Sequence, residues 1–289
     1  MRIVAFERHQ VGVVEGDAVY DLTPWLAPQG RHTPHAVQYL IADFENIRAR
    51  YQRERDQLER YPLASIRLLP PVPAPGQILG APTNYREHGQ EMQGTVMSDA
   101  NRRGTPETLG LFWKSPTSVA GPHDAVELPD LPGRRFDHEA ELGVVIGREA
   151  RSVDPSQALS YVFGYTCLMD LTLRMDETHK EERSWRKSYH SFTPIGPWIV
   201  TADEVPDPQV LTIQLWVNGE LRQKASTAAM IVPVARLIAL SSSVMPLKPG
   251  DLIATGTPAG VGPIAVGDRI RIAIEGIGEM ELPVRRREW

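Results

Sequence analysis

The chain has 289 residues, of which 42% are hydrophobic, and a formal net charge of −5 at pH 7. This length and composition allow a sizeable core, built as one large domain or as one large and one small domain. The basic residues are scattered apart from Arg285, Arg286 and Arg287, so no basic stripe could follow a phosphate backbone. The composition therefore argues against nucleic acid as a partner.

The single cysteine, Cys167, cannot form an internal disulfide. The first ten residues, MRIVAFERHQ, lack the apolar core of a signal peptide. No apolar run approaches the roughly 20 residues that a membrane-spanning helix needs. These features predict a soluble protein in a reducing, cytoplasmic setting, without a membrane partner.

The N-terminal part predicts a small sheet followed by helices. Residues 1–22 contain two strand-like stretches, MRIVAF and VGVVEGDAVYDL, which turn at charged and Gly-Asp positions. From Thr33, an N-cap candidate and a proline precede a polar, helix-favouring tail, which predicts one or two helices.

A cluster of prolines then interrupts any regular element. Pro70, Pro71, Pro73 and Pro75 fall within six residues, and each proline removes an amide donor and restricts the residue before it. We therefore predict a small N-terminal domain over residues 1–70 and a catalytic domain over residues 71–289.

The larger part begins with a polar segment and continues as short strands. Residues 86–108, REHGQEMQGTVMSDANRRGTPET, have few apolar anchors, which predicts a mobile surface segment. Beyond Gly110, short apolar stretches alternate with turn signals such as GPHD, NGE, KPGD and VGD. This pattern indicates an α+β, β-rich fold with a roll or barrel.

The stretch FDHEAELGVVIG, residues 136–147, places carboxylates at every second position. In an extended chain Asp137, Glu139 and Glu141 share one face, while the apolar side chains share the other. Like charges at this spacing repel unless a cation lies between them, so Glu139 and Glu141 are candidates to bind a divalent metal. The alternative is the solvated face of a half-exposed strand.

A third carboxylate, Asp170, lies in the apolar run YVFGYTCLMDLTL. A buried charge needs a partner, which a turn or Arg174 could supply. If Asp170 instead converges with Glu139 and Glu141, the oxygen-rich set suits Mg²⁺, Mn²⁺ or Ca²⁺ better than zinc, because no cluster of Cys and His accompanies it.

Two further motifs could take part in the chemistry. In NYREHGQEM, His88 and Glu91 lie three residues apart and share a face if they form a helical turn, as a general base and its orienting carboxylate would; the alternative is an exposed polar face. The stretch TGTPAGVG, residues 255–262, resembles an anion-cradling loop but lacks the GK[ST] ending, so it could equally be a tight connection between strands.

Taken together, seven ordered segments between about Ile78 and about Arg285 resemble the fumarylacetoacetate hydrolase family. The segments are NYREHGQEM, LFWKSPTSV, DHEAELGVVIG, GYTCLMDLT, RKSYHSFTPIGPWIVTADEV, VNGELRQ and LKPGDLIATGTPAGVG. The resemblance implies a mixed β-roll catalytic domain, a small N-terminal α/β domain, and commonly a homodimer formed through the β-rich domain.

The resemblance also implies roles for individual residues. The implied metal ligands are Glu139, Glu141 and Asp170, with Mg²⁺ as the expected ion and Mn²⁺ or Ca²⁺ as alternatives. The implied catalytic residues are His88 and Glu91 on a lid, together with Lys187. The residues implied to contact the substrate are Tyr85, Lys114, Gln223 and Thr257.

Two departures from the family pattern affect the expected substrate. Many members have G-R-N-Y or G-L-N-Y before the His and Glu pair, whereas this chain has GAPTNY, so the arginine of the first type and the substrate contact that it implies are not expected here. The stretch RMDETHKEERSW after Asp170 is also divergent and crowded with charge.

The expected substrate is a small 2-oxo acid, which can chelate a metal through its carboxylate and keto oxygens. Water activated by His88 and Glu91 would attack a second carbonyl, and cleavage would release a pyruvate-type enolate that the metal stabilises and whose charge Lys187 offsets. We therefore predict carbon-carbon hydrolysis of an acylpyruvate (a 2,4-dioxo acid), as in aromatic catabolism. The alternatives are a decarboxylase of an oxaloacetate-like acid, an isomerase of a 2-hydroxymuconate-like diacid, and a non-catalytic ligand-binding roll that keeps the metal for structure.

Overall fold

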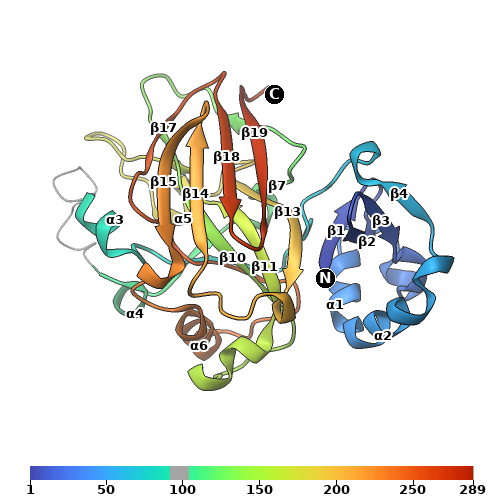
Figure 1. The fold of residues 1–289 in the computed structure, drawn as a ribbon. Coiled ribbons are helices and arrows are strands. Elements are labelled where there is room, and N and C mark those ends of the chain that lie inside the picture. Colours follow the sequence, from blue (N-terminus) through green and yellow to red (C-terminus); the bar gives the residue numbers. More distant parts are fainter. Residues whose placement is uncertain (92–103, 289) are drawn as a thin grey trace.

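The computed structural model describes residues 1–91 and 104–288, and Figure 1 shows a small N-terminal unit beside a larger unit rich in strands. Most strands of the larger unit are short and separated by turns, as the sequence predicts. The α+β, β-rich fold class is confirmed.

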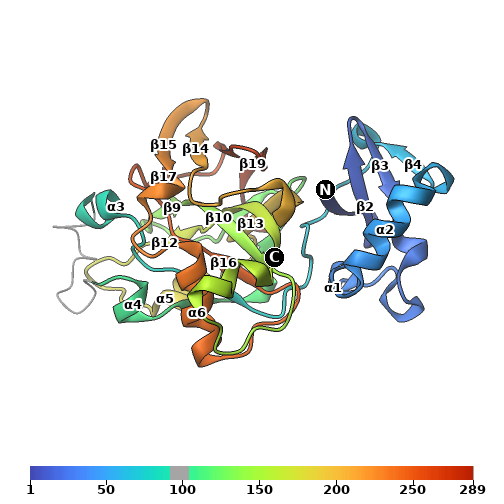
Figure 2. The ribbon, with the colours of Figure 1, turned by 60° about the horizontal axis from the view of Figure 1, so that its bottom comes forward.

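The N-terminal unit is a small antiparallel sheet covered by two helices. Its main elements are β1 (Arg2–Phe6), β2 (Gln10–Glu15), β3 (Ala18–Asp21), α1 (Ala36–Ala42), α2 (Phe44–Glu54) and β4 (Arg60–Pro62). The stretch VGVVEGDAVYDL, expected as one strand, is a hairpin of β2 and β3, because Gly16 adopts a left-handed conformation (φ 59°) and turns the chain back. Both expected helices form, and Figure 2 shows them against one face of this sheet.

Strands of the larger unit fall into three sheets. These strands are β5 (Ile78–Gly80), β6 (Phe112–Lys114), β7 (Val119–Ala120), β8 (Val126–Leu128), β9 (Phe136–His138), β10 (Ala140–Ile146), β11 (Val162–Met169), β12 (Thr172–Leu173), β13 (Thr193–Thr201), β14 (Thr212–Val217), β15 (Glu220–Ser226), β16 (Leu252–Ala254), β17 (Gly262–Ile264), β18 (Arg269–Ile274) and β19 (Gly278–Arg286). The largest sheet has the order β4-β3-β2-β1-β13-β11-β10-β16-β5-β6, with β7 paired to β13. The others have the orders β12-β9-β17 and β15-β14-β18-β19-β8.

Helices of the larger unit are short. They are α3 (Arg86–Glu91), α4 (Pro106–Leu109), α5 (Arg183–Arg186) and α6 (Val234–Val244). Both figures place α3 at the edge of the larger unit farthest from the N-terminal unit. Among the helices of the described residues, none has the length and apolar character needed to cross a membrane.

The predicted boundary at the prolines coincides with irregular chain, but the two sides share a sheet and a core. Residues 70–77 contain neither helix nor strand. However, β1 pairs with β13 through Arg2 with Val200 and Ile3 with Ile199, so the large sheet runs across both units. One buried cluster also joins residues from both sides, including Leu40 of α1 and Val145 of β10. The division into domains stays a prediction, and the packing indicates that the two parts fold against each other.

The strand that carries the carboxylates is buried, not half-exposed to solvent. All residues of β9 and β10 are buried, on both faces. At Glu139 the chain passes from the three-stranded sheet into the largest sheet, where β10 lies between β11 and β16. The interpretation of a half-exposed acidic face is therefore wrong.

The segment predicted to be mobile, residues 86–108, is described only in part. Its two ends form α3 and α4. The intervening part of that prediction, residues 92–103, lies outside the described residues.

We predict that Phe163→Ala destabilises both units together. Phe163 is only 7% exposed and packs edge-to-face on Phe44 of α2, with 4.8 Å between ring centroids. Truncating a core phenylalanine typically costs about 3–5 kcal/mol. Chemical denaturation followed by circular dichroism should show this loss in a single transition. Two separated transitions would mean that the N-terminal unit unfolds independently.

Candidate active site

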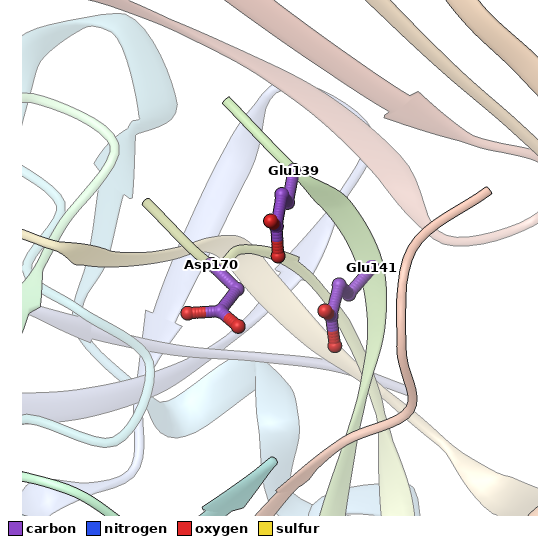
Figure 3. A group of neighbouring side chains, drawn as sticks. All are labelled: Glu139, Glu141 and Asp170. Carbon is purple, nitrogen blue, oxygen red and sulfur yellow. The ribbon is translucent and has the colours of Figure 1, made fainter. Parts of the chain in front are cut away.

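Three carboxylates converge at the junction of two neighbouring strands. Glu139 lies in the break between β9 and β10, Glu141 lies on β10, and Asp170 follows β11. The antiparallel register pairs Ala140 with Met169, and the backbone N–H of Asp170 donates to the carbonyl of Glu139. One oxygen from each carboxylate lies within 4.8 Å of the others, and Figure 3 shows the three groups turned toward one another.

Two buried lysines neutralise part of this charge. The ammonium of Lys187 donates to Glu139 Oε2 (2.8 Å), Asp170 Oδ2 (2.5 Å) and the hydroxyl of Thr172 (2.7 Å). The ammonium of Lys114 donates to Asp170 Oδ1 (2.5 Å) and to the carbonyls of Lys187 and Phe192. Both lysines use three donors within the protein, so they hold the carboxylates in place.

Arg174 is a further cation beside the carboxylates. Its guanidinium donates to Glu139 Oε1 and to Asp137 Oδ2, both at 2.6 Å. The sequence offered Arg174 as a partner of Asp170, which was wrong, because Asp170 is paired with the two lysines instead. Asp137 also pairs with Arg135, and through its bond to Arg174 it helps to hold the guanidinium that contacts Glu139.

The carboxylates differ in their electrostatic surroundings. Burial alone would raise the pKa of Glu139, but the charges of Lys187 and Arg174 outweigh it and hold that pKa well below its usual range. Burial raises the pKa of Glu141, and the charge of Asp170 raises it further. A nearby cation stabilises the charged form of a buried carboxylate that lies beside a second carboxylate. Of the triad, Glu141 would therefore be stabilised most by an added positive charge.

The residues present fit a divalent metal. The triad offers only carboxylate oxygens, which are hard ligands preferred by Mg²⁺, Mn²⁺ and Ca²⁺. All three side chains are nearly inaccessible to water, so a bound cation would remove the repulsion that burial makes costly.

The loop TGTPAGVG binds carboxylates of the protein itself. It connects β16 to β17, and the N–H of Gly256 donates to Glu141 Oε2 at 2.7 Å. The N–H of Gly260 donates to the carboxylate of Glu91 at 3.1 and 3.2 Å. The interpretation as a cradle for a free anion is therefore wrong for these two donors. Through these two N–H groups, the loop connects Glu141 to Glu91 of α3.

Two of the three glycines in this stretch are required by geometry. Gly256 and Gly260 have φ angles of 92° and 93°, which favour glycine. A Cβ on Gly256 would lie 2.5 Å from Cβ of Asn84, and one on Gly260 would lie 2.0 Å from the carbonyl oxygen of Arg222. Side chains here would push the loop away from Glu141 and Glu91.

His88 and Glu91 form a contact on α3. Nδ1–H of His88 points at Glu91 Oε2 across 3.4 Å, which leaves Nε2 able to accept a proton. This contact outweighs burial and, with the N–H of Gly260, lowers the pKa of Glu91. His88 is buried and close enough to Glu139 to interact with it electrostatically, so the interpretation of an exposed polar face is wrong for His88.

The remaining predicted site residues are buried near this cluster. Tyr85 precedes α3, and its hydroxyl is buried without a hydrogen-bond partner among the residues described. Burial and the charge of Glu141 raise the pKa of Tyr85, so the phenol stays neutral and can donate. Gln223 and Thr257 bond to each other at 2.8 Å. Substrate contact by these residues, and by Lys114, stays a prediction.

Comparison with known proteins identifies the family. Residues 77–285 match the family described as "Fumarylacetoacetate (FAA) hydrolase C-terminal", which covers most of the chain. The chain belongs to the fumarylacetoacetate hydrolase family. The resemblance seen in the sequence is thereby confirmed.

Related proteins align over their full length. The chain is 41% identical over 293 residues to maleylpyruvate hydrolase of Aquipseudomonas alcaligenes, covering 99% of each chain. It is 41% identical to maleylpyruvate hydrolase from Sphingobium sp. SYK-6, whose crystal structure in complex with manganese(II) ion and pyruvate matches with a TM-score of 0.87 over 100% of both chains. A 5-carboxymethyl-2-hydroxymuconate delta-isomerase from Mycobacterium smegmatis matches with 29% identity and a TM-score of 0.75 over 100% of both chains.

Several contributors to the site were missed by reasoning from the sequence. These are Gly256 and Gly260 as N–H donors, Thr172 as a partner of Lys187, and His138 as a partner of Gln223. The closely spaced glycines in TGTPAGVG could have indicated the N–H donors of Gly256 and Gly260, because glycine permits close approach of the backbone. The others depend on contacts between distant segments.

We predict that Lys114→Met strongly destabilises the protein. The change leaves the buried carboxylate of Asp170 with one ammonium fewer and removes a donor from the carbonyls of Lys187 and Phe192, of which the second keeps the N–H of Leu171. Breaking a buried ion pair costs about 3–5 kcal/mol. Urea unfolding measures this loss, with Lys224→Met as the matched control, because Lys224 is exposed and should change stability by less than about 0.5 kcal/mol. Equal stability of the two variants would show that Asp170 does not need Lys114.

Proposed function

We propose that this protein is a divalent-metal-dependent hydrolase that cleaves a carbon-carbon bond in an acylpyruvate, and that maleylpyruvate is the first substrate to test. The observation that carries the proposal is the buried triad of Glu139, Glu141 and Asp170 beside His88 and Lys187. The 41% identity to a maleylpyruvate hydrolase over 99% of both chains supports the substrate class.

In this proposal Glu139, Glu141 and Asp170 hold the cation, which supplies a Lewis acid for the 2-oxo carboxylate end of the substrate. Tyr85 and Thr257 donate hydrogen bonds to substrate oxygens from buried positions. Lys114 acts through Asp170, whose orientation it fixes.

His88 is the proposed general base, with Glu91 fixing its tautomer. Nε2 of His88 takes a proton from water, and the water oxygen bonds to the carbonyl carbon distal to the 2-oxo acid. The bond between that carbon and the neighbouring methylene then breaks, which yields a carboxylic acid and the enolate of pyruvate. Water protonates the enolate carbon, and His88 returns its proton to solvent, which completes the reaction. Lys187 offsets negative charge on the attacked oxygen.

The identity of the metal belongs to this proposal. We expect Mg²⁺ to support activity, because three carboxylates suit a hard cation. Mn²⁺ should substitute, since it shares this ligand preference and the Sphingobium relative is described in complex with it. We also propose a homodimer and a cytoplasmic location, on the family resemblance and on the single free cysteine, Cys167.

An isomerase is the second candidate, because a relative with this fold carries that name. Isomerisation of a 2-hydroxymuconate-like diacid, or decarboxylation of an oxaloacetate-like acid, also passes through an enolate but needs no attacking water. Turnover of maleylpyruvate, oxaloacetate and a hydroxymuconate-type diacid, each with Mg²⁺ or Mn²⁺, separates these reactions.

We predict that oxalate binds only when a divalent metal is present. Oxalate mimics the chelating end of the substrate and the planar enolate. Isothermal titration calorimetry should detect binding with Mn²⁺ and none after chelation with EDTA. Equal affinity under both conditions would show that oxalate binds away from the triad and would refute the proposed substrate geometry.

We predict that His88→Ala separates hydrolysis from enolisation. Removing a general base typically costs about 10²- to 10⁴-fold in rate, so hydrolysis of maleylpyruvate should fall by that order. Metal-dependent exchange of pyruvate methyl protons for deuterium, followed by NMR, should fall much less, whereas Glu139→Ala should abolish both reactions.

The matched control for His88→Ala is Glu87→Ala, an exposed position on the same helix, which should hydrolyse at the wild-type rate. Metal affinity should be unchanged in both variants. Wild-type hydrolysis by His88→Ala would remove His88 and Glu91 from the mechanism.

A further inference from the structure

A buried chain of hydrogen bonds connects β9, β15 and the glycine-rich loop. His138 Nδ1 lies 3.2 Å from Gln223 Oε1, which also accepts from the N–H of Ala140 at 3.0 Å. Gln223 Nε2 donates to the hydroxyl of Thr257 and to the carbonyl of Pro258, both at 2.8 Å. His138, Gln223 and Thr257 are each at most 3% exposed.

The chemistry of these partners fixes the direction of every bond. The N–H of Ala140 can only donate and the carbonyl of Pro258 can only accept, so the oxygen and nitrogen of the Gln223 amide cannot exchange places. Because Oε1 is an acceptor, His138 Nδ1 must carry a proton and donate it. The amide of Gln223 therefore makes four hydrogen bonds within the protein and has none left for a substrate.

The same logic orients the hydroxyl of Thr257. Its oxygen accepts from Gln223, so its own proton is directed to another acceptor. The preceding residue, Gly256, donates its N–H to Glu141, which places Thr257 beside the carboxylate triad. A substrate oxygen bound at the triad is an acceptor of the kind that this proton needs.

We propose that His138 and Gln223 are positioning residues that aim the hydroxyl proton of Thr257 at the 2-oxo carboxylate end of the substrate. This inference rests on the proposed function and deepens it, since it replaces a direct substrate contact by Gln223 with an indirect role. His138 donates to Oε1 of Gln223, and Nε2 of Gln223 donates to the hydroxyl oxygen of Thr257. Of these three residues, only Thr257 touches the ligand.

A purely structural role explains His138 poorly. Its second ring nitrogen, Nε2, is buried without a hydrogen-bond partner among the described residues. Leaving a buried polar atom unsatisfied costs free energy, so an apolar ring of similar size would fill this position with less loss. We therefore expect His138→Phe to keep or raise the melting temperature while it weakens ligand binding.

The test is a double-mutant cycle on oxalate affinity with saturating Mn²⁺, measured by calorimetry. Thr257→Val removes the hydroxyl at constant shape and should weaken oxalate about tenfold, the value of one hydrogen bond. Gln223→Met should weaken it by a similar factor. In the Thr257→Val background Gln223→Met should have no further effect, because it acts through that hydroxyl. Mn²⁺ affinity should stay within about twofold throughout.

His138 supplies a second arm that keeps Gln223 intact. His138→Phe should weaken oxalate several-fold, whereas His138→Asn, whose amide N–H can replace Nδ1–H, should restore much of the affinity. Multiplicative losses in the cycle, or wild-type affinity in Gln223→Met, would overturn the role of Gln223. Equal affinities of wild type, His138→Phe and His138→Asn would overturn the role of His138.

Failure of the proposed function looks different. A wild-type protein that binds no oxalate with Mn²⁺ would refute both the substrate class and the substrate-facing role of Thr257. Metal-dependent oxalate binding by wild type together with unchanged variants would refute the positioning role alone.

Discussion

Mutual repulsion among Glu139, Glu141 and Asp170 is the constraint on which the rest of the site depends. Three carboxylates within 4.8 Å and nearly without water keep their charges only if cations or N–H donors face them. Two lysines, Arg174 and the N–H of Gly256 supply that compensation from separate elements. The need to balance these charges thus brings strands, the glycine-rich loop and the chain after β12 together around the triad. A divalent cation fits beside Glu141, where the negative charge is least compensated.

The carboxylate triad and the proposed base are attached to the fold in different ways. The carboxylates lie where β10 and β11 meet at one end, and these strands are inner strands of a sheet that extends from β4 in the N-terminal unit to β6, so backbone pairing fixes their separation. His88 and Glu91 lie on α3, a single short helix at the far edge of the larger unit, where the N–H of Gly260 holds Glu91. The N–H groups of Gly256 and Gly260 bind Glu141 and Glu91, so the glycine-rich loop connects the position of α3 with that of Glu141.

The sequence predicted the triad but not its surroundings, for a physical reason. A period of two places Glu139 and Glu141 on one face, and the burial of Asp170 demanded a partner. The same period also put Asp137 on that face, and the structure pairs it with Arg174 and Arg135. Hydrogen bonds between distant segments depend on tertiary packing, which local patterns do not encode. The fold class followed from turn signals, while the continuity of one sheet across the proline boundary did not.

The arrangement also explains why one scaffold can serve hydrolysis and isomerisation. In the proposed mechanism, the cation held by the triad would favour the enolate of a 2-oxo acid whichever reaction follows. Whether the enolate arises by water attack depends on a base at the right place, and in the proposed mechanism that base is His88 on α3, outside the large sheet. In that mechanism, substitutions on α3 change the reaction without disturbing charge balance at the triad. The segment GAPTNY, in which that arginine is absent, runs from the end of β5 through mostly buried chain to α3, so differences in substrate between members should arise beside the proposed base rather than in β10 or β11.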